Sequence, residues 1–285
     1  MIISFLPKNK PSSLELIVHN FTKGAQGKVL PISWWITNKR FPSDTTRVVT
    51  AGILRGGGDL LKKLNTTNMP YYYIDHAYFK AERRRPLGWM KWMRVTANGF
   101  NCTKITDTDS TKFNKLFDST FQLSPWRKDG QTILILPPTD PVKYVFGCHG
   151  WLDSVLTALQ GKTSRQIVIR TKPGEVLLDD TGKETGRTPY DPAQLPLEAE
   201  LSRAHCVITY NSSVAIQAAI EGIPVICSEQ CSAYPISNNM SDIEDLIEFD
   251  RLPWLYNLCN HQFETQELLS GKAYIYLEAE EEHNV

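Results

Sequence analysis

The stretch His205–Glu229, HCVITYNSSVAIQAAIEGIPVICSE, decides the fold class of this chain. It opens with an apolar, β-rich run at residues 206–210, and the Asn-Ser-Ser sequence at 211–213 supplies side chains that favour a helix N-cap. Residues 214–220 continue as a short helix, which a glycine two positions later suits as a C-terminal cap, and 223–227 form a second strand. This order predicts one strand–turn–helix–strand unit of a parallel sheet.

The turn in this unit is rich in small polar residues. Backbone N–H groups without intrahelical partners and the positive end of the helix dipole meet there, and both suit an anion such as phosphate. An ordinary βαβ crossover with a good cap would have the same sequence. The stretch by itself is therefore compatible with a phosphate site and with a purely structural turn.

Size and charge set the broad class. The chain has 285 residues, enough for one large α/β domain or two smaller ones. Its formal net charge is +0, so no global field attracts nucleic acid or an acidic membrane, and a polyanion would need a local patch. No apolar run approaches the roughly 18–20 residues that span a bilayer, and the N-terminus lacks a signal-peptide layout. We therefore expect a cytoplasmic protein.

The six cysteines are scattered along the chain, several of them in strand-like runs. Buried free thiols in a reducing compartment fit this distribution. Cys227 and Cys231 are the only closely spaced pair, and no second Cys or His pair stands at the spacing of a zinc site. We expect no metal.

Strands and helices alternate along the first half of the chain. Apolar patterning predicts strands at 2–6, 32–36, 48–54, 69–79 and 95–101, and helices over 14–25 and 111–117. The strand at 69–79 carries Asp75 and His76 near its end. In open parallel sheets ligands bind outside the carboxyl ends of the strands, and a carboxylate beside an imidazole there can act as a general base. The alternative is that Asp75 caps a turn and His76 is a satisfied polar residue near the core.

A basic and aromatic segment follows at residues 80–94, KAERRRPLGWMKWMR. Cations interleaved with tryptophans are typical of a surface that binds a polyanion or stacks on bases. The alternative is a solvated basic loop whose tryptophans cover the domain surface. The candidate contact residues of this surface are Arg84, Arg85, Trp89 and Arg94.

A second run of α/β units begins near residue 131. Strands are predicted at 132–136 and 166–170, and helices at 151–160, 197–203, 254–259 and 262–269. Arg170 and Lys172 stand at the carboxyl end of the second of these strands, where two cations suit a diphosphate or a sugar-acid carboxylate. They fit a pair of surface cations at a strand end equally well. We expect residues 174–196 to form a mobile loop and the acidic tail at 278–282 to fray.

We therefore predict an α/β fold of two Rossmann-like, doubly wound domains that face each other across a cleft. The composition of residues 121–130 places the boundary there. The expected domains are 1–128 and 129–250, with helices at 251–285 that pack back across both and end in the acidic tail.

Three parts of the chain carry a resemblance to a known family. Residues 73–79 (YIDHAYF) and 94–101 (RVTANGFN) together resemble a segment that contains, in this order, an acidic residue, Gly-Tyr, an arginine and a T…G-x-N motif. Residues 169–173 (IRTKP) resemble a strand that ends in Lys-x-His-Pro, and 211–225 (NSSVAIQAAIEGIPV) resemble an S-S-x-G-x-E-A-L-x-x-G-K-P-V nucleotide-binding helix. The set resembles glycosyltransferases of the two-domain GT-B type, and more narrowly capsule-polysaccharide and phage glycosyltransferases related to Kdo transferases and polysialyltransferases.

Three positions depart from that pattern. The histidine of the His-Pro element is missing in the Lys172-Pro173 context, Gln217 stands in place of a glutamate, and Ala77 stands in place of a glycine. The missing histidine and glutamate would touch the donor nucleotide, so the identity of the donor does not follow from the resemblance.

The resemblance implies a division of labour. The first domain would hold the acceptor, with Asp75 and His76 as its catalytic residues. The second domain would bind a nucleotide sugar, which is a substrate and not a cofactor, without a metal ion. The residues implied for that binding are Arg170, Lys172, Asn211, Ser212, Ser213 and Gln217.

The resemblance implies that Arg84, Arg85, Trp89 and Arg94 bind the acceptor, but it leaves the identity of the acceptor open. The basic aromatic segment favours a polyanion, either a hydroxymethylpyrimidine in phage-type DNA or an acidic surface glycan, and a phage-encoded enzyme would act in the host cytoplasm. Two other classes remain: a non-catalytic nucleotide- or sugar-binding α/β protein, and a phosphosugar isomerase or epimerase.

Overall fold

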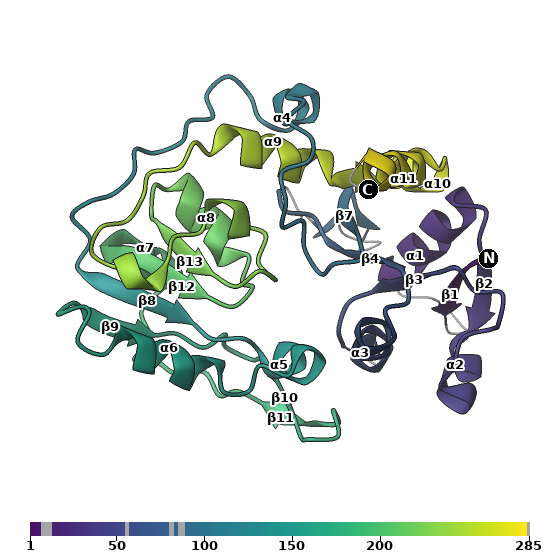
Figure 1. The fold of residues 1–285 in the computed structure, drawn as a ribbon, viewed down its shortest axis with the longest axis horizontal. Coiled ribbons are helices and arrows are strands. Elements are labelled where there is room, and N and C mark those ends of the chain that lie inside the picture. Colours follow the sequence, from purple (N-terminus) through teal and green to yellow (C-terminus); the bar gives the residue numbers. More distant parts are fainter. Residues whose placement is uncertain (7–12, 55–56, 80–82, 85–88, 284–285) are drawn as a thin grey trace. The chain divides into compact units, whose positions relative to one another are not determined.

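The computed structural model describes residues 1–6, 13–54, 57–79, 83–84 and 89–283 (Figure 1). Arg85 and the neighbouring residues 80–82 and 86–88 of the basic segment lie outside the described residues. The described chain is mixed α/β with mainly parallel sheets, as predicted from the sequence. It divides into two compact units: the first comprises Met1–Phe100, Asp109–Leu116 and Asn257–Val285, and the second comprises Asn101–Thr108 and Phe117–Tyr256.

The first unit is built on one sheet with the strand order β14-β7-β4-β3-β1-β2. Its strands are β1 (Ile2–Leu6), β2 (Lys28–Pro31), β3 (Arg47–Ala51), β4 (Tyr71–His76), β7 (Trp92–Ala97) and β14 (Gln262–Glu264). The four strands from β2 to β4 run parallel, whereas β7 is antiparallel to β4 and β14 is antiparallel to β7. A segment from near the C-terminus thus completes a sheet that the N-terminal residues begin.

Helices cover both faces of this sheet (Figure 1). The helices of this unit are α1 (Ser13–Gly24), α2 (Ile32–Asn38), α3 (Gly57–Thr67), α4 (Thr111–Leu116), α10 (Thr265–Leu269) and α11 (Lys272–His283). Helix α9 (Leu252–Asn260) connects the second unit to the first. Phe21 of α1, Tyr72 of β4 and Leu277 of α11 belong to one buried cluster, so α1 and the C-terminal helices share a core with the sheet. The short strands β5 (Arg83–Arg84) and β6 (Trp89–Met90) pair with each other.

The strand predicted at residues 32–36 is wrong, because these residues form helix α2. Pro31 ends β2 and stands at the helix N-cap, where its missing N–H and fixed φ are tolerated. Trp35 is buried and its ring lies 5.4 Å from Phe41 and 5.9 Å from Phe5. Packing of one aromatic face against the sheet therefore outweighs the β preference of the apolar run.

The helix predicted at 262–269 is partly wrong, because residues 262–264 are strand β14 and the helix α10 begins at Thr265. Glu264 is the N-cap, and a capping box with Glu267 fixes the start: the Glu264 backbone N–H donates to the Glu267 carboxylate at 2.8 Å.

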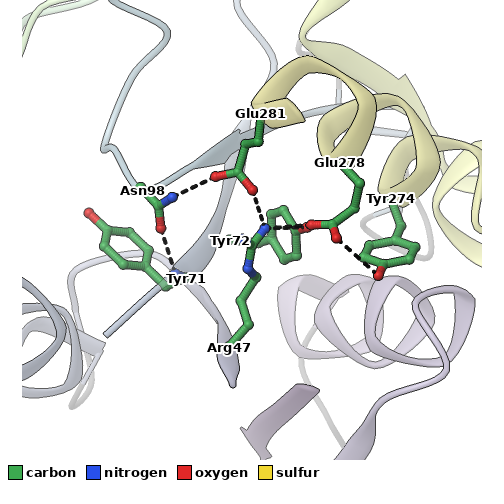
Figure 2. A network of polar contacts seen from close by, with 7 residues as sticks. All are labelled: Arg47, Tyr71, Tyr72, Asn98, Tyr274, Glu278 and Glu281. Carbon is green, nitrogen blue, oxygen red and sulfur yellow. Dashed lines mark hydrogen bonds and ion pairs between the residues drawn. The ribbon is translucent and has the colours of Figure 1, made fainter. Parts of the chain in front are cut away.

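The acidic tail is not frayed within the described residues, because it belongs to α11 and contacts the sheet (Figure 2). Arg47 Nη1 lies 2.6 Å from Glu278 Oε1 and 2.6 Å from Glu281 Oε2. Arg47 also donates to the Tyr72 hydroxyl at 2.6 Å, and that hydroxyl donates to Glu278. Burial and the hydrogen bond to Glu278 raise the pKa of Tyr72, so the phenol stays protonated and remains a donor.

A second set of contacts extends the same network (Figure 2). Asn98 Nδ2 donates to Glu281 at 2.6 Å, while Asn98 Oδ1 accepts from the Tyr71 backbone N–H at 2.9 Å. The Tyr274 hydroxyl donates to Glu278 at 3.3 Å. Helix α11 is thereby fixed to the amino end of β4 and to the residue that follows β7.

We predict that Arg47→Met lowers the free energy of unfolding of the protein by about 2 kcal/mol, because two carboxylates lose a charged donor at a partly buried position. Lys39→Met is the control, because the Lys39–Asp59 pair at 3.8 Å is largely exposed and should change stability by less than about 0.5 kcal/mol. Urea unfolding followed by tryptophan fluorescence measures both. Equal midpoints for the two variants would contradict the anchoring role of Arg47.

The second unit is built on a fully parallel sheet with the order β13-β12-β8-β9. Its strands are β8 (Thr132–Leu136), β9 (Gln166–Ile169), β12 (Ala204–Thr209) and β13 (Val225–Cys227). Helices α5 (Asp140–Phe146), α6 (Trp151–Leu159), α7 (Leu197–Arg203) and α8 (Val214–Ile220) and the 3₁₀ turns η1 (Tyr234–Ile236) and η2 (Met240–Asp242) complete it. Strands β12 and β13 pair in parallel and are joined by α8, which confirms the unit predicted for residues 205–229.

The loop predicted at residues 174–196 is wrong in part. It contains an antiparallel hairpin of β10 (Val176–Leu178) and β11 (Glu184–Arg187). Asp179 makes the reversal, because its carboxylate accepts from the backbone N–H groups of Thr181 at 2.9 Å and Lys183 at 3.0 Å. The strands are too short for periodicity to show them in the sequence.

Gly222 ends α8 at a point of close backbone approach. Its φ is +78°, and a Cβ built there would lie 1.9 Å from the Pro125 carbonyl oxygen. Arg251 packs over Trp126 at 4.1 Å and donates to the Ala219 and Ser124 carbonyls at 2.5 and 2.7 Å, so the opposing backbone has little room to move. The C-terminal cap predicted at Gly222 is thus confirmed, with a packing reason added.

We predict that Gly222→Ala destabilises the protein by at least about 2 kcal/mol, because it combines a strained φ with a clash against backbone. Gly186→Ala is the control, since nothing lies within 4 Å of a Cβ there and its φ is not in the left-handed region. Thermal unfolding of both variants measures the difference. A Gly222→Ala melting temperature equal to that of the control would show that the Pro125 segment yields.

Candidate functional site

Asp75 lies at the carboxyl end of β4, one residue before the strand ends. Its Oδ2 accepts from the Tyr73 hydroxyl at 2.9 Å and from Arg94 Nη2 at 3.2 Å. Its Oδ1 accepts from the His76 backbone N–H at 2.7 Å. The side chain is 24% exposed. The carboxylate is therefore oriented by three donors and still reaches solvent.

Backbone register brings Arg94 to this carboxylate. Asp75 of β4 and Arg94 of β7 are direct partners in the antiparallel pair. Residues opposite each other in such a pair project their side chains to the same face of the sheet, with Cβ atoms roughly 5 Å apart. The Asp75–Arg94 ion pair is thus a cross-strand pair, which the separation of 19 positions in the sequence conceals.

Arg94 is enclosed by aromatic rings. Its guanidinium carbon lies 5.9 Å from the ring centroid of Tyr73, 5.3 Å from that of Tyr78 and 5.4 Å from that of Phe100. The side chain is only 11% exposed. Burial lowers the pKa of Arg94, but Asp75 and the tyrosines raise it, and the net pKa is raised. Burial, and then the Asp75 charge, hold the pKa of Tyr73 well above its usual value.

His76 is the more accessible member of the predicted pair. Its side chain is 47% exposed, and Nδ1 lies 3.9 Å from Asp75 Oδ1. That separation is too long for a direct hydrogen bond. It is short enough for the imidazole and the carboxylate to approach the same ligand atom.

The other residues predicted for the acceptor are less fully described. Arg84 and Trp89 are register partners in the antiparallel β5–β6 pair. Arg94 belongs to the Asp75 cluster. The structure therefore describes the side-chain contacts of Arg94, while Arg85 lies outside the described residues.

In the second unit Arg170 follows β9, and its side chain is 14% exposed. Its Nη1 donates to the Leu195 carbonyl and lies 3.9 Å from Glu200 Oε1, a carboxylate on α7 that is itself buried. Lys172 is exposed, and its backbone carbonyl accepts from the Thr188 hydroxyl at 2.9 Å. The predicted pair of cations is thus unequal, because Arg170 is engaged by protein groups and Lys172 is exposed to solvent.

The turn at 211–213 has the predicted position between β12 and α8. The Ser212 N–H donates to Thr209 Oγ1 at 3.3 Å, and Ser212 Oγ accepts from the Val214 N–H at 3.2 Å. Ser213 is exposed and is the N-cap, without a side-chain cap bond. Asn211 is half-buried.

Gln217 lies one turn into α8, and its Nε2 donates to Glu221 at 2.9 Å within the same helix. The role of this turn in phosphate binding stays a prediction. Of its two serines, Ser212 already stabilises the turn and Ser213 is exposed.

Sequence reasoning missed an aromatic group beside this turn. Tyr210 directly follows β12, and its ring lies 6.1 Å from Phe146 at the end of α5 and 6.1 Å from Trp151 at the start of α6. All three side chains are partly exposed. Burial, and then neighbouring Cys148, raise the pKa of Tyr210 to about 12. The position of Tyr210 at a strand end was the available signal.

The cysteines are free, and Cys102, Cys206, Cys231 and Cys259 are buried, as the sequence predicted. Burial raises the pKa of Cys259 to about 12. In the described part of the chain no cluster of three or more His, Cys, Asp or Glu side chains could hold a metal ion. Within the same residues no helix has the length and apolar character needed to cross a membrane.

Comparison with known proteins gives a distant structural likeness. No family model matches the chain, and no curated protein matches its sequence. One similar solved structure is KpsC of Thermosulfurimonas dismutans, beta Kdo 2,7 transferase, with a TM-score of 0.46 and 11% identity over 96% of this chain and 99% of that chain. Another is KpsC of the same organism, beta Kdo 2,4 transferase, with a TM-score of 0.44 and 12% identity over 93% of this chain and 92% of that chain. These values are too low to assign an activity or a residue's role to this chain.

We predict that the two serines of the turn behave differently. Ser212→Ala should lower the free energy of unfolding by about 1 kcal/mol, because the Val214 N–H loses its side-chain acceptor. Ser213→Ala should leave stability unchanged, because its hydroxyl makes no cap bond. Chemical denaturation of the two variants measures this contrast. Should the turn also bind phosphate, Ser213→Ala will weaken nucleotide binding without destabilising the protein.

Proposed function

We propose that this chain is a glycosyltransferase that moves a sugar from a nucleotide-sugar donor to a hydroxyl group of an acceptor. The observation that carries the proposal is the partly exposed Asp75 carboxylate at the carboxyl end of β4, held by Arg94, Tyr73 and the His76 N–H. Ligands of open α/β sheets bind at this end of the strands. The segments that resemble GT-B enzymes include both Asp75 and Arg94.

The proposed reaction balances as follows. Asp75 accepts the proton of the acceptor hydroxyl while the hydroxyl oxygen forms a bond to the anomeric carbon of the donor sugar. The bond from that carbon to the phosphate oxygen breaks, and its electron pair leaves with the nucleotide. A positioned general base of this kind contributes about 10²–10⁴-fold to the rate. His76 is proposed to contact the acceptor beside Asp75.

The proposed donor site is the carboxyl edge of the second unit's sheet. Exposed Lys172 and Ser213 are the groups we assign to the phosphates, with Asn211 and Ser212 shaping the turn. Fixed cations and N–H groups stabilise the charge that develops on the leaving phosphate. Arg170 and Gln217 already have protein partners, and we propose that they stabilise this edge of the sheet through those partners.

For the acceptor we propose a polyanion. The support is the basic and aromatic sequence of residues 80–94, of which Arg84 and Trp89 lie on the paired strands β5 and β6. The zero net charge of the chain implies that affinity would come from this local segment and would fall with added salt. Hydroxymethylpyrimidine DNA and an acidic glycan are the two acceptors to assay side by side.

We predict that Asp75→Asn lowers kcat for sugar transfer by about 10²–10⁴-fold while the dissociation constant of the donor stays unchanged, because the amide cannot take the proton. A thermal-shift screen of nucleoside mono- and diphosphates first identifies the donor class, since a ligand at one hundred times its dissociation constant stabilises the native state by about 2.7 kcal/mol. Release of free nucleotide from a panel of matching nucleotide sugars then measures transfer.

Asp59→Asn is the control for this substitution, because Asp59 is an exposed carboxylate on α3 in the same unit. Full activity of Asp75→Asn would remove Asp75 as the base. A wild-type protein that binds a nucleotide sugar but never releases free nucleotide, with any acceptor, would instead be a binding protein. Conversion of a phosphosugar without nucleotide release would indicate an isomerase.

A further inference from the structure

We propose that Arg94 is a positioning residue: together with Tyr73 it holds Oδ2 of Asp75, so that Oδ1 is the oxygen that takes the proton of the acceptor. This inference rests on the proposed function and deepens it. It also replaces the direct acceptor contact that the sequence predicted for Arg94 with an indirect role.

The first argument is the division of partners between the two carboxylate oxygens. Among the described residues, Oδ2 accepts two side-chain bonds, from Tyr73 at 2.9 Å and from Arg94 at 3.2 Å, whereas Oδ1 accepts one backbone bond, from His76 at 2.7 Å. A carboxylate oxygen has two lone pairs, so Oδ1 keeps an acceptor position. A guanidinium bound to Oδ1 would occupy a lone pair that the proton needs, and here the guanidinium is bound to Oδ2.

The second argument is the burial of Arg94. The rings of Tyr73, Tyr78 and Phe100 surround its guanidinium, and only 11% of the side chain is exposed. An arginine that recognises a large acceptor needs an accessible guanidinium, because recognition is bidentate at its N–H groups. This one points its charge at Asp75 inside the unit.

The third argument is an unsatisfied donor. Arg94 Nε is buried and has no hydrogen-bond partner among the described residues. A buried charge with an unmade hydrogen bond is unfavourable unless a close counter-ion compensates it, and Asp75 is the carboxylate at hydrogen-bond distance. The cluster therefore retains an unmade hydrogen bond at a strand end, which is the kind of local cost that functional sites carry.

The fourth argument is rigidity. Asp75 and Arg94 are register partners on β4 and β7, and β4 is also paired with β3 on its other side. The backbone of both residues is therefore held by paired strands. Groups held by paired strands keep the productive geometry more closely than groups on loops.

The kinetic test compares Arg94→Met, Arg94→Lys and Arg47→Met. For a positioning role we expect Arg94→Met to lower kcat about 10²-fold with the KM of donor and acceptor unchanged, because the base is misplaced and neither substrate loses a contact. Arg94→Lys should recover part of the loss, because it restores the charge without the planar fork.

Arg47→Met is a matched control, because Arg47 also pairs with carboxylates and packs over a tyrosine, Tyr72 at 4.7 Å, in the same sheet. It should keep the kcat of the folded wild-type protein. A raised acceptor KM with kcat retained in Arg94→Met would overturn the proposal and restore a direct acceptor contact. An equal loss of kcat in folded Arg47→Met would also overturn the proposal, because the loss in Arg94→Met would then reflect general destabilisation of the protein.

A second measurement does not depend on activity. Labelling with ¹⁵N-histidine gives at most six backbone signals, one for each histidine, and His76→Gln identifies that of His76. The His76 N–H reports on Asp75 because it donates to Oδ1. We expect its signal to move in Arg94→Met while the other histidine signals stay in place, and to stay in place in Arg47→Met.

An unmoved His76 signal in folded Arg94→Met would overturn the proposal, whatever the kinetics. An inactive wild-type protein would instead overturn the proposed function, and the same spectra would still decide whether Arg94 holds the Asp75 carboxylate. The two failures are therefore distinguishable.

Discussion

The antiparallel pairing of β7 with β4 is the constraint on which the first unit depends. At one end of the pair, register sets Arg94 opposite Asp75, and the two side chains form an ion pair. At the other end, Asn98 follows β7 and binds the Tyr71 backbone and Glu281 of α11. A shift of one residue in this register would turn Arg94 to the other face and break both ends together. One strand pair thus fixes the candidate site and the attachment of the C-terminal helix.

The stabilising contacts of α11 and the Asp75 cluster nevertheless involve different residues at opposite ends of the sheet. Arg47 and Tyr72 hold Glu278 at the amino end of the sheet, whereas Asp75 and its partners occupy the carboxyl end. The contacts of Arg47 and Tyr72 with Glu278 contribute to the free energy of folding. They do not involve the Asp75 carboxylate that is proposed as the base. We therefore expect that the stabilising hydrogen bonds and the functional cluster can be altered separately, by substitution of Arg47 or of Arg94.

The sequence predicts those features that local patterning determines. The buried runs of β4, β8 and β12 are recognisable because their apolar residues are continuous, and the turn at 211–213 is recognisable from its polar residues. Prediction from the sequence fails where contacts with residues distant in the chain determine the structure. Residues 32–36 form a helix because Trp35 packs on Phe5 and Phe41. Residues 262–264 form a strand because they pair with the edge of β7. The Asp75–Arg94 pair was hidden for the same reason: both residues were singled out, but in separate roles, because nothing local shows that β7 returns beside β4.

The second unit shows how a residue's existing partners limit its role. Arg170 is bound by the Leu195 carbonyl and Glu200, Gln217 by Glu221, and Ser212 by the Val214 N–H. A ligand that recruited any of these side chains would first have to break a bond within the protein, and the gain would be reduced accordingly. Lys172 and Ser213 are exposed, so they can meet an anion without that loss. Substitution of Lys172 or Ser213 can therefore change ligand binding without changing the stability of the protein.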